Sequence, residues 1–149
     1  MSVKLVAIAL LAVLVSCGLV GASHITFFPL SEHTIAREIS ESGMPLYRTY
    51  TFTTDDEQAA SWLLIWRDSQ VHRVEWRWYW PEGRTYARSF STIPAIDGFT
   101  GMWAAPVWSC LKIKGTDVAR LPGTWKVDVI VDYRKVLTEY FTINSPQAC

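Results

Sequence analysis

The segment Val71–Trp80, with the sequence VHRVEWRWYW, decides the fold because its side chains alternate strictly between apolar and polar. In an extended chain, successive side chains point to opposite faces. One face of this segment would carry Val74, Trp76, Trp78 and Trp80, and the other would carry Arg73, Glu75, Arg77 and Tyr79. This pattern is typical of a strand with a core on one side and water on the other. The segment is therefore predicted to be a strand whose tryptophans belong to the core.

The same two-residue period continues over most of the chain from Thr34 onward. Residues 92–106 are rich in Pro and Gly and predict a long loop. Short strands at 8–12-residue spacing, separated by turns, are typical of a β-sandwich. We predict strands at 34–39, 46–53, 60–67, 71–80, 85–91, 107–114, 124–131 and 135–143.

Two stretches resemble immunoglobulin-like domains of bacterial extracytoplasmic proteins. The stretch 121–143, LPGTWKVDVIVD followed by a hairpin and YFTI, resembles their closing hairpin, and 74–83, VEWRWYWPEG, resembles a strand and turn in the middle of the domain. The resemblance covers about 34–144, and no cysteine lies between 18 and 109 to form the disulfide of antibody domains. It implies an all-β fold, a single immunoglobulin-like or fibronectin-III-like β-sandwich of seven to eight antiparallel strands, over residues 34–149.

The N-terminus has the features of an export signal, since Lys4 precedes an apolar run from Leu5 to Val15. Leu14-Val15-Ser16-Cys17 resembles the lipobox of bacterial lipoproteins. The resemblance implies that residues 1–16 are a signal peptide and that Cys17 carries lipid such as diacylglycerol and palmitate. It also implies that 17–33 form a tether, and that Gly18 favours the outer membrane facing the periplasm in a Gram-negative cell.

Two other interpretations of the N-terminus remain open. The run Leu5–Ala22 is long enough for a single membrane span, which needs about 17–25 residues. Gly21-Ala22-Ser23 could instead be a signal-peptidase site that releases a secreted protein. All three interpretations place the body of the chain outside the cytoplasm.

Charge and cysteine content limit the partners and the chemistry. The chain has 14 basic and 14 acidic residues, so the basic patch of a nucleic-acid-binding protein is not expected. If Cys17 carries lipid, Cys110 and Cys149 remain, and an oxidising compartment would allow them to form a disulfide. The alternative is two separate thiols.

Candidate binding residues come from the eight tryptophans. Trp103 and Trp108 flank the Pro- and Gly-rich loop, where exposed rings could stack on the C–H faces of a sugar. The three histidines, His24, His33 and His72, are scattered and are expected to be solvated, so no metal site is predicted.

The sequence predicts no enzyme and no cofactor, because it has neither the Gly-x-Ser-x-Gly of a nucleophile elbow nor a Gly-rich phosphate loop. We expect a non-catalytic exported lipoprotein, attached to a membrane through its N-terminal lipid, that acts as a binding or accessory module for another cell-envelope protein. The alternative is a carbohydrate-binding lipoprotein that uses exposed aromatics of the 99–108 loop. A sugar binder should show two or more coplanar exposed rings, whereas a protein adaptor should show an apolar patch or an unpaired strand edge.

Overall fold

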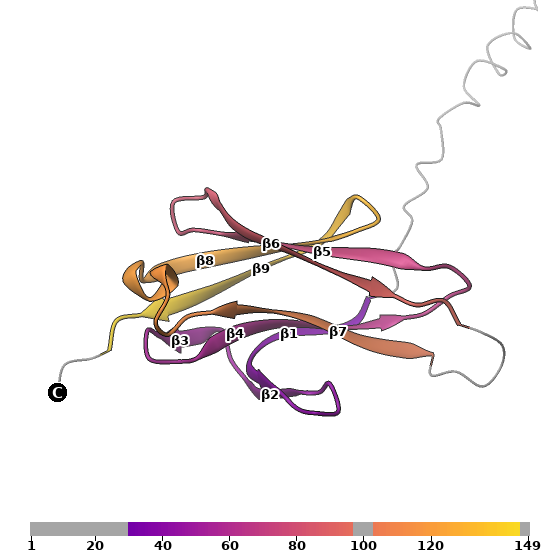
Figure 1. Cartoon of the computed structure of the whole chain (residues 1–149), viewed down its shortest axis with the longest axis horizontal. Coiled ribbons are helices and arrows are strands. Elements are labelled where there is room, and N and C mark those ends of the chain that lie inside the picture. The colour runs from indigo at the N-terminus through magenta and orange to yellow at the C-terminus, as the bar shows by residue number, and fades with distance from the viewer. Residues whose placement is uncertain (1–29, 97–102, 147–149) are drawn as a thin grey trace, which may run out of the picture.

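The computed structural model describes residues 30–96 and 103–146, and these form two sheets packed face to face (Figure 1). Sheet A has the strand order β2-β1-β4-β7, and sheet B has the order β3-β9-β8-β5-β6. The elements are β1 (Leu30–Ile39), β2 (Pro45–Arg48), β3 (Thr51–Thr53), β4 (Gln58–Trp66), β5 (His72–Tyr79), β6 (Thr85–Ile93), β7 (Ala104–Lys112), the 3-10 helix η2 (Asp117–Arg120), β8 (Gly123–Val131) and β9 (Arg134–Asn144).

This architecture confirms the predicted all-β, immunoglobulin-like sandwich. The order β9-β8-β5-β6 corresponds to strands G, F, C and C′ of an immunoglobulin-like domain, and β1-β4-β7 corresponds to A, B and E. Consecutive strands cross between the sheets after β2, β3, β4, β6 and β7, so residues far apart in sequence face one another across the core.

The predicted strand at 46–53 is two strands in different sheets, which raises the number of strands in the described residues to nine. β2 pairs with β1 in sheet A, whereas β3 pairs with β9 in sheet B. The β3–β9 pairing is parallel, so the expectation of a wholly antiparallel sandwich is wrong at this point. Tyr47 has a positive φ of 55°, a conformation that interrupts a regular strand, and the chain then passes to the other sheet.

Two further boundaries differ from the prediction. β1 begins at Leu30, earlier than the expected Thr34, because Leu30 already pairs with Ile65 of β4. The predicted loop at 92–106 is shorter, because Ala104 pairs with Trp66 and begins β7. The first residue of β1, the last of β4 and the first of β7 therefore lie at the same end of sheet A (Figure 1).

The core between the sheets is built on large aromatic side chains. Trp76 and Trp78 of β5 are fully buried, as the alternation predicts, and Trp78 packs edge-on against Phe141 of β9 with ring centroids 5.9 Å apart. Trp80 is half-buried and contacts Trp125, with centroids 5.0 Å apart.

Among the described residues, no helix has the length and apolar character needed to span a membrane.

Candidate functional site

The two tryptophans predicted to bind a ligand are both solvent-accessible. Trp103, just before β7, is 57% exposed, and Trp108, inside β7, is 40% exposed. Trp108 is therefore a strand residue, as the predicted strand at 107–114 implies, and the binding loop at 99–108 does not extend to it. Residues 97–102 of that loop lie outside the described residues, so a binding role for the loop stays a prediction.

Of the three cysteines with a predicted role, only Cys110 lies in the described residues. Cys110 lies on β7 and pairs in register with Ala60, and burial raises the pKa of its thiol. Cys17 and Cys149 lie outside the described residues. Lipid attachment at Cys17 and the disulfide between Cys110 and Cys149 therefore stay predictions.

The outer side of sheet A carries apolar side chains where a sandwich sheet usually exposes polar ones. On β4, Ala59, Leu63 and Ile65 pack in the core, so the alternate residues point outward. β7 contributes outward side chains that pair with these in register. We call this surface the apolar face; it consists of Ala60, Trp62, Leu64 and Trp66 of β4 and Pro106 and Trp108 of β7.

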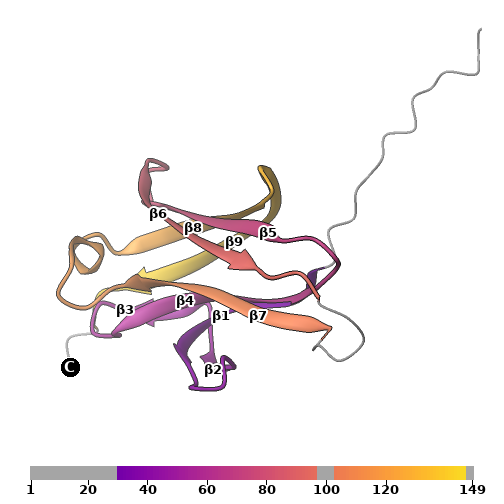
Figure 2. The ribbon, with the colours of Figure 1, turned by 45° about the vertical axis from the view of Figure 1, so that its right-hand side comes forward.

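The chain covers only part of the apolar face with its own residues. The turn between β1 and β2 folds over Trp62, whose indole N–H donates a hydrogen bond to the Gly43 carbonyl at 2.8 Å. Figure 2 shows β2 and its turn projecting from the outer side of sheet A. Trp62 is fully buried by this turn, whereas Trp66 remains 48% exposed and Met44, on the turn itself, is 45% exposed.

The exposed tryptophans do not stack on one another. Close ring pairs within residues 30–96 and 103–146 join core or half-buried rings, such as Trp78 with Phe141 and Trp80 with Tyr86. Within those ranges, no close ring pair joins Trp66, Trp103 or Trp108 to one another. The apolar patch expected of a protein adaptor is present among the described residues, and a sugar-binding role for the exposed rings stays a prediction.

A buried carboxylate, Glu139 of β9, points between the two sheets. Its Oε2 accepts a hydrogen bond from Ser61 at 3.2 Å, its Oε1 lies 2.9 Å from Nδ1 of His33, and the Tyr50 hydroxyl donates to Oε1 at 3.4 Å. Burial, together with the charge of Glu139, raises the pKa of Tyr50. His33 is thus part of β1 and remains partly exposed, so the expectation that it belongs to a tether is wrong.

The Glu139 network has the residue types of a catalytic triad but not its connections. In a triad the serine hydroxyl is hydrogen-bonded to the imidazole, which can then take its proton. Here Ser61 donates to the carboxylate instead, and the Ser61 side chain is fully buried between the sheets. The arrangement therefore fastens β1, β4 and β9 together and provides no activated nucleophile.

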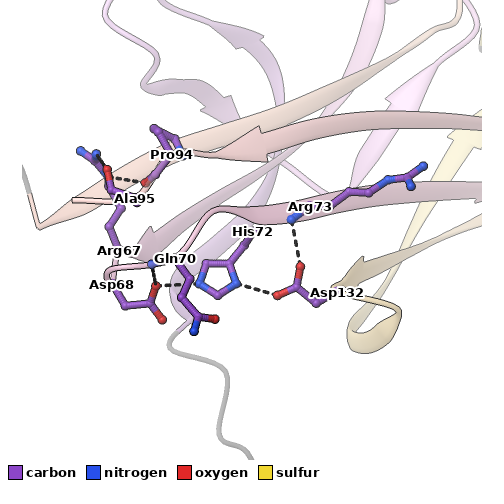
Figure 3. Close-up of polar contacts among 8 residues, drawn as sticks. All are labelled: Arg67, Asp68, Gln70, His72, Arg73, Pro94, Ala95 and Asp132. Carbon is purple, nitrogen blue, oxygen red and sulfur yellow. Dashed lines mark hydrogen bonds and ion pairs between the residues drawn. The ribbon is translucent and has the colours of Figure 1, made fainter. Parts of the chain in front are cut away.

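A second histidine is held between two carboxylates at the end of the sandwich (Figure 3). Nδ1 of His72 lies 2.6 Å from Asp132 and Nε2 lies 2.9 Å from Asp68. Asp132 also accepts a hydrogen bond from the Arg73 backbone N–H at 3.0 Å. These contacts fasten the start of β5 to the turn between β8 and β9, so the expectation of a solvated His72 is also wrong.

We call His72, Asp68 and Asp132 the His72 clamp, and in it each charged form stabilises the opposite charge beside it. Partial burial acts to lower the pKa of His72, but the hydrogen bonds and charges of Asp132 and Asp68 outweigh it and raise the pKa. Burial likewise acts to raise the pKa of Asp132, and the contacts with His72 and Arg73 outweigh it and lower the pKa. Within the described part of the chain, no group of three or more His, Cys, Asp or Glu side chains is placed to hold a metal ion.

Comparisons with known proteins give remote structural similarities. No protein-family model matches the chain, and no curated protein sequence matches it. The alkylpurine DNA glycosylase AlkC of Pseudomonas fluorescens, bound to DNA containing an abasic-site analogue, is similar at 14% identity and a TM-score of 0.43, over 76% of this chain and 30% of the glycosylase chain. An immunoglobulin-like protein of Pseudomonas aeruginosa is similar at 10% identity and a TM-score of 0.45, over 76% of this chain and 98% of that protein.

Proposed function

We propose that the chain is a non-catalytic lipoprotein of the cell envelope that binds another envelope protein through the apolar face. The observation that carries this proposal is the outward row Trp62, Leu64 and Trp66 on β4. The chain's own turn buries the first of these, while Leu64 is half-buried and Trp66 is 48% exposed. Exposed contiguous apolar surface of this kind marks interaction sites on soluble domains.

The composition of the apolar face suits the centre of a protein interface. Interface centres are depleted in charge and enriched in Trp and Met; the apolar face provides the exposed Trp66 and Trp108, and the covering turn provides the exposed Met44. Removing about 100 Å² of each exposed tryptophan from water would contribute roughly 2.5 kcal/mol per ring before the costs of association. Charged groups lie at the rim, where Glu32 of β1 forms an ion pair with Arg48 of β2.

The outer side of sheet B provides the contrast. Its outward-facing residues on β5 are Arg73, Glu75 and Arg77, and ion pairs join Glu75 to Arg77 and to Arg88. A salt-bridged surface of this kind is compatible with water on its own. The difference between the two outer surfaces supports a docking role for sheet A.

The membrane attachment in this proposal comes from the sequence. Lipid on Cys17, with two or more acyl chains, would hold the protein stably at a membrane. Residues 18–29 would link that anchor to the first residue of β1, with Gly18 favouring the outer membrane in a Gram-negative cell. The two alternatives to a lipid anchor are a secreted protein and a single membrane span, and the mass of the mature chain would distinguish all three.

Site-specific photo-crosslinking in the living cell tests the docking role. A benzophenone amino acid would replace Trp66 on the apolar face and, as the matched control, Tyr140 on the outer side of sheet B. Both are aromatic residues on the outer side of a sheet, and Trp66 is 48% exposed and Tyr140 is 61% exposed. The proposal predicts one discrete protein adduct from position 66 that is stronger than any adduct from position 140. Equal adducts from the two positions, or none from position 66, would overturn it.

The carbohydrate alternative uses an overlapping surface, because Trp103 and Trp108 are also exposed. It makes a different prediction, since purified envelope polysaccharide would then quench tryptophan fluorescence with saturation. Substituting Trp103→Ala would abolish that quenching while leaving the crosslink at position 66 unchanged.

A further inference from the structure

The outer side of sheet B contains an open groove of about 620 Å³ that the docking role does not use. Its charged lining consists of Arg73, Glu75, Arg77, Arg88, Asp128 and Lys135, with Ile130 and Tyr133 completing the walls. Four of these side chains are basic and two are acidic. Because the whole chain has equal numbers of basic and acidic residues, this is a local concentration of positive charge.

Two arginines lie directly opposite each other in the groove. Arg77 of β5 pairs in register with Arg88 of β6, and like charges in such a position destabilise a sheet. One carboxylate offsets both charges, because Oε1 of Glu75 accepts from Nε of Arg88 at 2.7 Å and from Nη2 of Arg77 at 2.9 Å. The hydrogen bond from Arg88, followed by that from Arg77, lowers the pKa of Glu75, so this carboxylate is ionised.

A third arginine is held by an aromatic ring and not by an acid. The guanidinium of Arg73 lies 4.4 Å from the centre of the Phe90 ring, and that of Arg88 lies 5.6 Å from the same ring. None of the ion pairs among the described residues includes Arg73. Stacking on Phe90 fixes the guanidinium while leaving its five N–H groups directed to the surroundings.

The acidic side chains of the groove are already engaged. Asp128 accepts a hydrogen bond from Thr138 at 2.7 Å and lies 3.6 Å from Nζ of Lys126 and 4.0 Å from Nζ of Lys135. Glu75 uses one donor of Arg88 and two of Arg77, out of five on each guanidinium. The groove therefore presents surplus N–H donors and surplus positive charge to solvent.

We infer that this groove binds an extended acidic segment of a partner protein through the carboxylates of two Asp or Glu residues that lie four positions apart. Arg73 and Arg77 are four residues apart on β5, which spaces them about 13 Å apart, and Glu75 lies between them. Residues four positions apart in an extended peptide have the same spacing, so one carboxylate would meet Arg73 and the other would meet the Arg77–Arg88 pair, with a neutral residue opposite Glu75. Arginine forks bind carboxylates in paired hydrogen bonds, which gives such a segment a defined register.

The test uses the full chain in detergent and two labelled peptides of equal length, one with Glu and the other with Gln at every fourth position and Thr at the rest. Fluorescence anisotropy at low salt should show saturable binding of the Glu peptide, no binding of the Gln peptide, and weaker binding as salt is raised. The double variant Arg73→Gln, Arg88→Gln should weaken binding at least tenfold. The control Arg84→Gln, Arg120→Gln removes the same charge from two exposed sites outside the groove and should change binding less than twofold.

The outcomes separate this inference from the docking role of the apolar face. Equal weakening in the two double variants, or no binding of the Glu peptide at low salt, would overturn the inference. Saturable binding of inorganic phosphate together with no binding of the Glu peptide would also overturn it, because the groove would then hold a small anion. Thermal unfolding of each variant verifies that it is folded, and Trp66 is unchanged in all of them, so a crosslinking failure at position 66 has no bearing on this result.

Discussion

The indole N–H of Trp62 donates a hydrogen bond to the carbonyl of Gly43 across 2.8 Å, and this contact fastens the turn before β2 onto sheet A. Gly43 is buried and adopts a positive φ of 79°, which a glycine tolerates and a side-chain-bearing residue rarely does. A Cβ at this position would also lie 3.1 Å from the Trp108 ring. The bond divides the apolar face into a part covered by the chain and a part open to a partner.

Replacing Trp62 with Phe should destabilise the domain by about 1–3 kcal/mol. The substitution removes the N–H donor and leaves the buried Gly43 carbonyl without its partner. Denaturant unfolding gives the free energy. Trp66→Phe is the control on the same side of β4 and should change stability by less than about 0.5 kcal/mol, since that ring is half exposed. A similar loss of stability in both variants would show that the Trp62–Gly43 hydrogen bond does not cause the destabilisation.

The Glu139 network predicts energetic coupling between residues distant in sequence. Glu139→Gln should cost about 1–3 kcal/mol, because it removes the charged acceptor of three side chains. A double-mutant cycle with Ser61→Ala should give a coupling free energy of at least about 0.5 kcal/mol. The same cycle run with Glu38→Gln, an exposed carboxylate of β1, should be additive. Additivity in both cycles would contradict the network.

The His72 clamp predicts a stability that depends on pH. The pKa of His72 is higher in the folded protein than in the unfolded chain, where it is about 6.5. Protonated His72 therefore stabilises the folded protein fully below about pH 6.5, and this stabilisation is lost as the pH rises through the folded-state pKa. Asp68 and Asp132, whose pKa values are lowered, stay ionised across this window. The melting temperatures of the native protein and His72→Gln should therefore differ most below pH 6.5 and converge at higher pH. A difference that grows with pH would contradict this account.

The lipid anchor predicts a specific mass for the protein extracted from its own membrane. The mature chain should begin at Cys17 and carry acyl groups, and Cys17→Ser should lose the added mass and leave the membrane fraction. An uncleaved chain would instead make Leu5–Ala22 a membrane span. A chain that begins near His24 without added mass would make the protein a secreted domain.

The sequence pattern was sufficient for strands in which one face is buried and the other is charged. The predicted segments 71–80, 124–131 and 135–143 correspond to β5, β8 and β9 to within about one residue at each end. Their alternation reports burial directly, so neighbours in space are not needed to recognise them. The tryptophans of β5 are in the core for the same reason.

Pairing partners explain where the pattern fails. Ala104-Ala105-Pro106 has little strand propensity, yet it pairs with Trp66, Ile65 and Leu64, and a proline is tolerated because β7 is an edge strand. The interruption between β2 and β3 depends on which sheet offers an edge, and local sequence does not contain that information.

The candidate sites depend on tertiary structure in the same way. The Glu139 network joins residues from β1, β4 and β9, and no spacing in the sequence links them. The sequence does indicate the apolar face, because the residues of β4 are apolar on both sides of the strand. Such a pattern predicts a strand in the centre of a sheet. β4 is indeed central in sheet A, but only part of its outer face is covered by the chain.

The most direct test of the central claim is the dissociation constant of the partner captured at position 66, measured for Trp66→Glu and Tyr140→Glu. Both substitutions place one negative charge at an exposed aromatic position of a folded sheet. If the apolar face is the docking surface, Trp66→Glu raises the dissociation constant at least tenfold, because a carboxylate must be buried unpaired, and Tyr140→Glu changes it less than twofold. Equal effects of the two substitutions would contradict the claim.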